Sequence, residues 1–163
     1  MTRADLARKT GLLLDANLLV LYVIGCYDPK RIVQNKRTNS YTPEDFDLLV
    51  DFMTQFRQFA TTPNILTEVS NLLEGVSYQY GPVLAMLPEL IKEFVELHEP
   101  SHPIMSSKNK EFIKFGLSDT VSCQVVEQSY VLLTDDFDLC YYLLNNGFDA
   151  LNFTNLRSGY LLL

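Results

Sequence analysis

Short apolar runs alternate along this chain with longer segments whose apolar residues recur every three or four positions. The first run, 12–14, consists of three leucines and ends at Asp15. The apolar residues after it predict a helix that ends near Gly25, with Asn17 as its N-cap. We therefore interpret 12–14 as a buried strand that leads directly into a helix.

The same alternation continues to the end of the chain. Further helices are predicted from a cap at Thr42, over 63–73 with a stop at Gly75, over 82–97, after a cap at Ser118, and over 137–146. Further strands are predicted at 59–62, 130–134 and 150–153, and a loop rich in Pro and Ser at 98–110. This order predicts an α/β fold with three layers, α/β/α, around a mostly parallel central sheet.

Length and composition favour one domain, 1–163, because 163 residues of which 47% are hydrophobic can form a sizeable core. One segment differs from the rest. Residues 26–43 are polar and basic, with little of the apolar pattern found elsewhere. They are expected to form an exposed insert in this domain.

The charge and the cysteines narrow the class of protein. A net charge of −7 argues against a general nucleic-acid binder, but acids that hold divalent cations also add to this count. The three cysteines are far apart and form no C-x-x-C pair, which favours free thiols in a cytoplasmic protein. No signal-peptide pattern or membrane-length apolar run occurs, so no membrane association is expected.

Four acids are expected to lie at one edge of the sheet. Asp15 and Asp136 follow predicted strands. Glu68 and Asp119 lie near the starts of predicted helices. The carboxyl ends of parallel strands and the N-termini of the helices share one edge, so these carboxylates can converge. Their mutual repulsion would be relieved by a hard divalent cation, Mg²⁺ or Mn²⁺.

Each acid also has a plain structural interpretation. Asp119 can complement a helix dipole, and Asp135 or Asp136 can cap the helix that follows them. Glu68 can lie on a solvated helix face. Asp15 is the hardest to explain in this way, because the run before it is so apolar. The prediction of a metal site therefore rests on the combination of acids.

The segments that carry these acids resemble the motifs of the PIN-domain nucleases, which include the VapC-like ribonuclease toxins. The matching segments are Leu12–Asn17, Ile65–Val69, Gly116–Asp119 and Leu132–Leu139. The resemblance implies a PIN-like fold and a ribonuclease that depends on Mg²⁺ or Mn²⁺. It also implies that the catalytic, metal-holding residues are Asp15, Glu68, Asp119 and Asp136.

The resemblance further implies supporting roles and partners. Asn17 and Thr134 would orient ligands or water, and Asp135 is a weaker candidate for the site. Such nucleases are often homodimers, and in the toxin branch a cognate antitoxin protein inhibits them. The insert at 26–43 is longer than the compact toxins usually carry.

Basic and aromatic residues in the insert suggest contacts with RNA. The main positive cluster consists of Lys30, Arg31, Lys36 and Arg37. These side chains can follow a phosphate backbone, or they can simply be solvated. Tyr27 and Tyr41 can stack on unpaired bases, or they can anchor the insert to the core.

The segment His98–His102 matches the letters of the zinc-protease pattern H-E-x-x-H. That pattern binds zinc only on a continuous helix, where the two imidazoles share one face. Pro100 and Pro103 disfavour such a helix, so an ordinary loop is expected here.

The leading hypothesis is an endoribonuclease that uses Mg²⁺ or Mn²⁺ to hydrolyse phosphodiester bonds of single-stranded RNA, as the toxin of a toxin-antitoxin pair. The alternative is a non-catalytic binding or scaffold module of the same fold, whose acids recognise a partner. A phosphatase or phosphotransferase with Asp15 as nucleophile is a weaker hypothesis, because such enzymes usually need a second acid where Asn17 stands.

Overall fold

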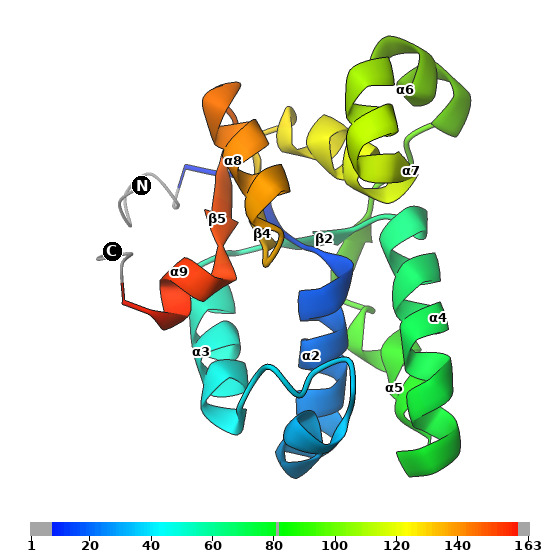
Figure 1. Cartoon of the computed structure of the whole chain (residues 1–163), viewed down its shortest axis with the longest axis vertical. Helices are drawn as coiled ribbons and strands as arrows, with labels where there is room; N and C mark the ends of the chain where they lie inside the picture. Colours follow the sequence, from blue (N-terminus) through cyan, green and yellow to red (C-terminus); the bar gives the residue numbers. More distant parts are fainter. Residues whose placement is uncertain (1–7, 81, 160–163) are drawn as a thin grey trace.

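The computed structural model describes residues 8–80 and 82–159, and in this part of the chain five strands form one sheet (Figure 1). The strands are β1 (Gly11–Leu14), β2 (Phe59–Thr61), β3 (Phe94–Glu96), β4 (Tyr130–Thr134) and β5 (Ala150–Asn152). Their order across the sheet is β3-β2-β1-β4-β5, and every pairing is parallel. The predicted α/β fold is confirmed, with a described sheet that is parallel throughout.

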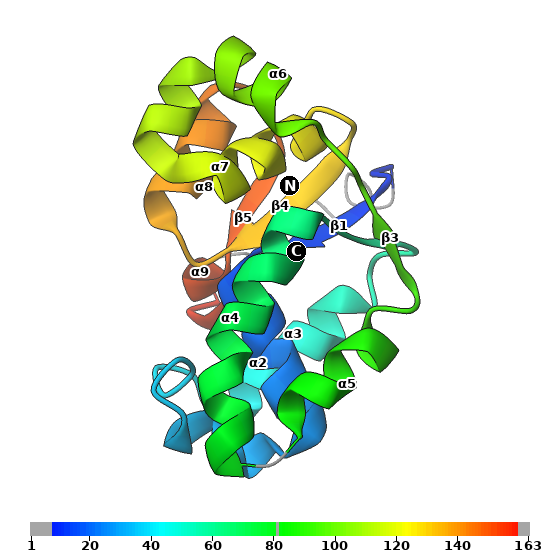
Figure 2. The same ribbon diagram turned by 90° about the vertical axis from the view of Figure 1, so that its right-hand side faces the viewer.

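Helices cover both faces of this sheet (Figures 1 and 2). Those on one side are α2 (Ala16–Tyr27), α3 (Pro43–Met53), α4 (Pro63–Tyr80) and α5 (Val83–Leu90), with the 3₁₀ helix η1 (Pro29–Gln34) after α2. Those on the other side are α6 (Ser101–Ser107), α7 (Asn109–Val126) and α8 (Phe137–Asn145). The short helix α9 (Phe153–Arg157) follows β5. This arrangement confirms the three predicted layers.

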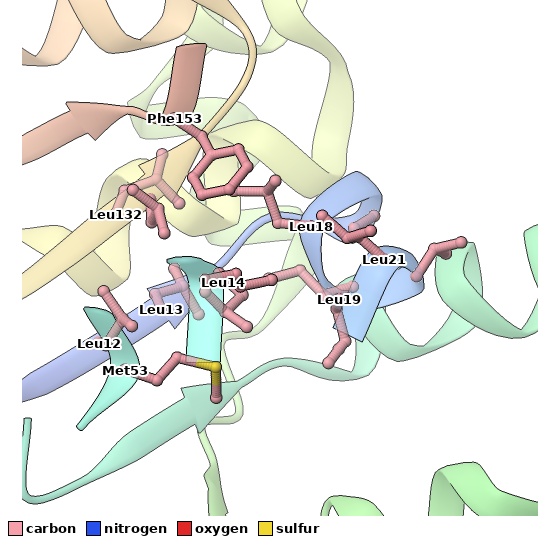
Figure 3. Close-up of a cluster of buried hydrophobic side chains, with 14 of the residues drawn as sticks. Leu12, Leu13, Leu14, Leu18, Leu19, Leu21, Met53, Leu132 and Phe153 are labelled. Carbon is pink, nitrogen blue, oxygen red and sulfur yellow. The ribbon is translucent and has the colours of Figure 1, made fainter. Parts of the chain in front are cut away.

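The hydrophobic core surrounds the central strand, β1. Leu12, Leu13 and Leu14 are at most 1% exposed, because helices cover both faces of the strand and even consecutive side chains are buried. Figure 3 shows that this core combines side chains from β1, α2, β4 and α9. Each buried leucine contributes about 1.5–3 kcal/mol. This packing holds the carboxyl end of β1, and with it Asp15, in a defined position.

Several predicted boundaries are wrong. The helix predicted at 63–73 does not stop at Gly75 but continues as α4 to Tyr80. A glycine inside a helix costs only about 1 kcal/mol, so Gly75 by itself does not force the helix to end. The predicted cap at Thr42 is confirmed, and the helix that follows it ends at Met53.

The region 82–110 also differs from the prediction. Its first helix, α5, ends at Leu90, and the predicted remainder contains the edge strand β3. This strand forms because β2 supplies its only partner in the described sheet, and the rings of Phe59 and Phe94 lie 5.4 Å apart. The predicted loop 98–110 contains helix α6.

The insert 26–43 is more closely packed than predicted. Ile32, Thr38 and Tyr41 are buried, and the Thr38 hydroxyl donates a hydrogen bond to the Ile32 carbonyl at 2.8 Å. The segment therefore contributes to the core through a few inward residues, although its lysines are exposed. Of the two roles predicted for Tyr41, the structure shows the second, because its buried ring anchors the insert to the core.

No helix in the described ranges has both the length and the apolar character needed to cross a membrane. The three cysteines, all within these ranges, are free thiols, as the sequence predicts.

Candidate acidic site at the carboxyl edge of the sheet

Asp15 lies where β1 ends and α2 begins. Its Oδ1 accepts a hydrogen bond from the Leu18 backbone N–H at 2.8 Å, so Asp15 is the N-cap of α2. The prediction that Asn17 caps this helix is therefore wrong. Asn17 is exposed in the first turn of α2. The strand ends just before Asp15, and the helix begins just after it. Asp15 therefore fills both roles, the residue that follows β1 and the cap of α2, whereas the sequence pattern predicted a separate residue for the cap.

Thr134, at the end of β4, connects Asp15 with Asp136. Its hydroxyl donates to Asp15 Oδ2 and accepts from the Asp136 backbone N–H at 2.9 Å. The backbone N–H of Asp135 also donates to Asp15 Oδ2, at 3.1 Å. Parallel pairing of β1 with β4, in which Leu14 is opposite Leu133, creates this arrangement. Thr134 is fully buried, so its hydroxyl is committed to these two contacts.

The two acids after Thr134 point to different partners. Asp136 caps α8, with its Oδ1 accepting from the Leu139 N–H at 2.9 Å, and the residue is exposed. Asp135 accepts hydrogen bonds from the Tyr41 hydroxyl and, at 3.2 Å, from Thr154 Oγ1. Asp136 therefore borders the edge of the sheet, whereas Asp135 ties the insert and α9 to the end of β4.

Asp119 reaches the same edge from α7. Gly116 has φ +84°, a left-handed conformation that favours glycine, and it interrupts the helix. The second part of α7 therefore begins immediately after Gly116. Ser118 lies within its first turn and is not its cap, which corrects the prediction. Asp119 follows one residue later and is half-buried.

The pKa values of two acids are raised, mainly by burial and, at Asp119, also by nearby negative charge. The pKa of Asp119 is raised to about 7, first by burial and then by the charges of Glu68, Asp15 and Asp136, in that order. Burial likewise raises the pKa of Asp15 to about 6, although its hydrogen bonds to Thr134, Leu18 and Asp135 act in the opposite direction. The other three predicted acids therefore act electrostatically on Asp119, and among the described residues the charged groups that shift its pKa are all acids.

Glu68 lies on the second turn of α4 and is exposed. Neither its carboxylate nor that of Asp119 accepts a hydrogen bond from any residue in the described ranges. Both side chains therefore have oxygen atoms available for a ligand.

The donor set suits a hard divalent cation. Carboxylate oxygens are the ligands that Mg²⁺ and Mn²⁺ prefer, and the negative charge at this edge favours a cation. Within the described residues, no three His, Cys, Asp or Glu side chains are gathered closely enough to hold an ion directly. Mg²⁺ commonly binds through one or two carboxylates and keeps several waters, which fits acids that share an edge without touching.

Two of the four basic residues of the insert, Lys30 and Arg31, lie away from these acids. η1, which carries Lys30 and Arg31, follows the far end of α2, and 12 helical residues span about 18 Å (Figure 1). Arg31 is paired with Asp28 at 3.4 Å and lies over the Tyr27 ring. Lys36 and Arg37 are exposed in the turns after η1.

The two histidines of the H-E-x-x-H letters do not share a helix. His98 precedes α6, whereas His102 lies in its first turn. Both are exposed, so the facing imidazoles of a helical zinc site are not formed.

A search of protein-family models finds no match to the chain, and a search of curated proteins finds no significant match. These comparisons therefore name no family, and the class of protein is described by its fold alone. Five parallel strands in the order 3-2-1-4-5, flanked by helices, form a PIN-like topology.

The contacts around Asp135 could not be predicted from the sequence. Tyr41 is 94 residues away from Asp135, and Arg157 joins the group by donating to Asp45 at 2.8 Å and by lying over the Tyr41 ring. No local pattern indicates these pairings. The composition of the insert had indicated exposure, whereas Tyr41 is only 4% exposed.

Proposed function

We propose that this protein is a PIN-domain nuclease that uses Mg²⁺ or Mn²⁺ to cleave single-stranded RNA. The observation that carries the proposal is the gathering of carboxylates at one edge of the sheet: Thr134 joins Asp15 to Asp136 by hydrogen bonds, and Asp119 feels the charges of Glu68, Asp15 and Asp136. Such an assembly is costly in a metal-free protein, since each ionised acid raises the energy of the others. A bound cation would reverse that cost.

The residues of the proposed site would have different roles in holding the cation. Asp15, Glu68, Asp119 and Asp136 would supply the oxygen ligands, directly or through water. Thr134 fixes the direction of the Asp15 carboxylate and the position of the Asp136 backbone. The exposed Asn17 side chain would orient water or substrate beside them.

A divalent cation at this edge would supply Lewis-acid activation of water and would neutralise charge that develops on the phosphate. The phosphodiester would approach the edge of the sheet on the exposed side of Asp136. The buried contacts behind Asp15 exclude solvent from the other side, which strengthens the electrostatic interactions there.

The finer parts of the proposal derive from the family resemblance. They are a toxin role with a cognate antitoxin, a homodimer, a cytoplasmic location, and contacts between RNA and the basic residues of the insert. Lys36 and Arg37 are exposed and available for such contacts, whereas Arg31 is already engaged by Asp28 and Tyr27.

The proposal is tested by incubating the purified protein with single-stranded RNA, with either Mn²⁺ or EDTA present. We expect the parent to cleave the RNA in Mn²⁺ and not in EDTA. We expect Asp119→Asn to abolish the cleavage in Mn²⁺. Asp47→Asn is the matched control, because Asp47 is an exposed acid on α3. Cleavage by Asp119→Asn at the rate of the parent would refute the proposal.

A binding or scaffold module is the second candidate. Two observations favour it: the described acids are not gathered within direct ligand distance, and both oxygens of Asp15 already accept hydrogen bonds. Calorimetric titration with Mn²⁺ separates the two candidates. A nuclease should bind Mn²⁺ saturably in a manner that depends on Asp15 and Asp119, whereas a scaffold should show no such binding.

A further inference from the structure

A cavity of about 420 Å³ lies between the start of α4 and the segment that joins β3 to α6. On one side it is lined by Pro63, Asn64 and Thr67 of α4. On the other side it is lined by residues 98–101, which are also the first four letters of the H-E-x-x-H match. Figure 2 shows this segment passing from β3 to α6 beside the first turn of α4.

The chemistry of the lining suits a flat, uncharged, polar group. Neither Lys nor Arg is among the residues that line the cavity, so it offers no cation for a phosphate. Its one acid, Glu99, already accepts a hydrogen bond from the Gln128 side chain at 2.7 Å. Two proline rings provide apolar surface. A nucleobase has this combination of apolar faces and a polar edge.

The lining also contains polar groups without a partner. Asn64 and Ser101 make no side-chain hydrogen bond with any residue of the described ranges. A carboxamide and a hydroxyl are groups that commonly pair with base edges. The His98 side chain is 73% exposed, so a face of its imidazole is open for stacking on a base.

The cavity adjoins the acidic site through α4. Asn64 and Glu68 are four residues apart, so they lie on the same face of the helix, one turn from each other. Glu68 in turn acts electrostatically on Asp119. A nucleotide chain whose phosphate lies at the acids can therefore place a neighbouring base in the cavity.

We propose that this cavity binds one unpaired base of the RNA substrate, next to the phosphodiester that is cut, and that Asn64 and Ser101 contact the edge of that base. His98 covers one face of it. This assignment rests on the proposed ribonuclease function. It makes Asn64 and Ser101 residues that determine sequence specificity, without a part in the chemical step.

Nuclear magnetic resonance in EDTA tests the assignment without cleavage. The isotope-labelled full-length protein is titrated with the four nucleosides and with a short single-stranded RNA. We expect at least one nucleoside and the RNA to shift the signals of Asn64 and Ser101, and Asn64→Ala to weaken both interactions about tenfold. Asn71→Ala, an exposed site further along α4, is the matched control and should change neither.

Signals of Asn64 and Ser101 that respond to no nucleoside and not to RNA would overturn the assignment. So would equal binding by the parent and Asn64→Ala. A response to nucleosides without a response to RNA would also overturn it, because the cavity would then bind a free nucleoside.

A cleavage experiment separates this assignment from the proposed function. We expect the parent to prefer particular bases beside the cut in a mixed-sequence RNA, and Asn64→Ala to relax that preference while Asn71→Ala keeps it. An unchanged preference in Asn64→Ala would overturn the base assignment and leave the ribonuclease in place. No cleavage by the parent would refute the ribonuclease, and the titration alone would then decide whether the cavity binds an RNA base.

Discussion

The acidic edge has two halves that differ in how their carboxylates are held. At the ends of β1 and β4, the carboxylates of Asp15 and Asp136 accept hydrogen bonds as helix caps, and Thr134 links the two residues. On α4 and α7, Glu68 and Asp119 accept no hydrogen bond from the described residues. One half is therefore fixed by the fold, and the other is held only by its helices.

This difference shows how a fold can tolerate a cluster of acids. Hydrogen bonds to backbone N–H groups stabilise an ionised carboxylate, and at Asp15 they offset part of the effect of burial on its pKa. Asp119 has no such compensation, so its pKa is raised to about 7 by burial and by its acidic neighbours. The half formed by Asp15 and Asp136 can position a ligand. In the uncompensated half, formed by Glu68 and Asp119, no hydrogen bond within the described part of the chain offsets the negative charge, so a bound cation would relieve more repulsion there.

The largest expected effect is a loss of RNA cleavage when an acid of the fixed half, Asp15, is replaced. Asp15→Asn should reduce Mn²⁺-dependent RNA cleavage by about 100-fold or more, because it removes a charge from the proposed metal site. The fold should be kept at reduced stability, because the asparagine oxygen can still cap α2 while its NH2 group cannot accept the hydrogen bonds from Thr134 and Asp135. Cleavage of labelled RNA and circular dichroism measure the two properties. A folded variant that is as active as the parent would exclude Asp15 from the site.

Thr134→Val tests how much the hydrogen bonds of the Thr134 hydroxyl stabilise the fixed half. Valine has nearly the same shape but cannot accept from the Asp136 N–H or donate to Asp15. We expect the free energy of unfolding to fall by about 2–3 kcal/mol in urea denaturation. Thr134→Ser should recover most of the loss. Thr54→Val, at an exposed site, serves as the control. If Thr134→Val were no less stable than the parent, the hydroxyl would not organise this half.

Asp119→Asn should stabilise the metal-free protein at alkaline pH, because Asp119 belongs to the uncompensated half. Folded Asp119 binds a proton below about pH 7, whereas the unfolded chain does so only below about 3.8. The free energy of unfolding of the parent therefore falls as the pH rises between these values. We expect the variant to be more stable by about 1–3 kcal/mol at pH 8, after allowance for solvent screening.

Denaturation curves at several pH values check this expectation. Near pH 4 the parent and Asp119→Asn should differ little, because Asp119 is then mostly protonated in the folded protein. Asp47→Asn should keep the pH dependence of the parent. The same pH dependence in the parent and Asp119→Asn would mean that the charge of Asp119 is compensated after all.

The smallest expected effect concerns the contact between the insert and Asp135. Tyr41→Phe removes one hydrogen bond to Asp135, while Thr154 still donates to it and the ring still packs near Phe153. We expect a loss of about 1 kcal/mol in urea denaturation and no change in cleavage rate. A loss of activity as large as that of Asp15→Asn would place Asp135 in the site and reverse its assignment as a structural residue.

Features with strong local chemistry were predicted correctly. The leucines of β1 form a buried strand. Thr42 begins α3 with a capping box in which its side chain and that of Asp45 bond reciprocally to the backbone. The helix predicted over 137–146 is α8, and Gly147, with φ +78°, follows its end. In each case the interaction lies within a few residues of the chain.

Features that depend on a distant partner were missed. β3 has little of the apolar pattern of a strand and forms because β2 pairs with it. The hydrogen bonds from Thr134 and Asp135 to the Asp15 carboxylate were not predicted, because no local pattern near Asp15 reveals donors so far along the chain. Ile32 is buried within an insert whose composition is polar.

The sequence by itself determined the class of fold, because the hydrophobic pattern sets the order of strands and helices, and it predicted four acids at one edge, three of which act electrostatically on the fourth, Asp119. Only the tertiary structure decided which of these carboxylates are hydrogen-bonded and which are left open. The contacts of Thr134 and Asp135 with Asp15 join residues 119 and 120 positions apart. Their geometry arises from the pairing of β1 with β4, which no local pattern encodes.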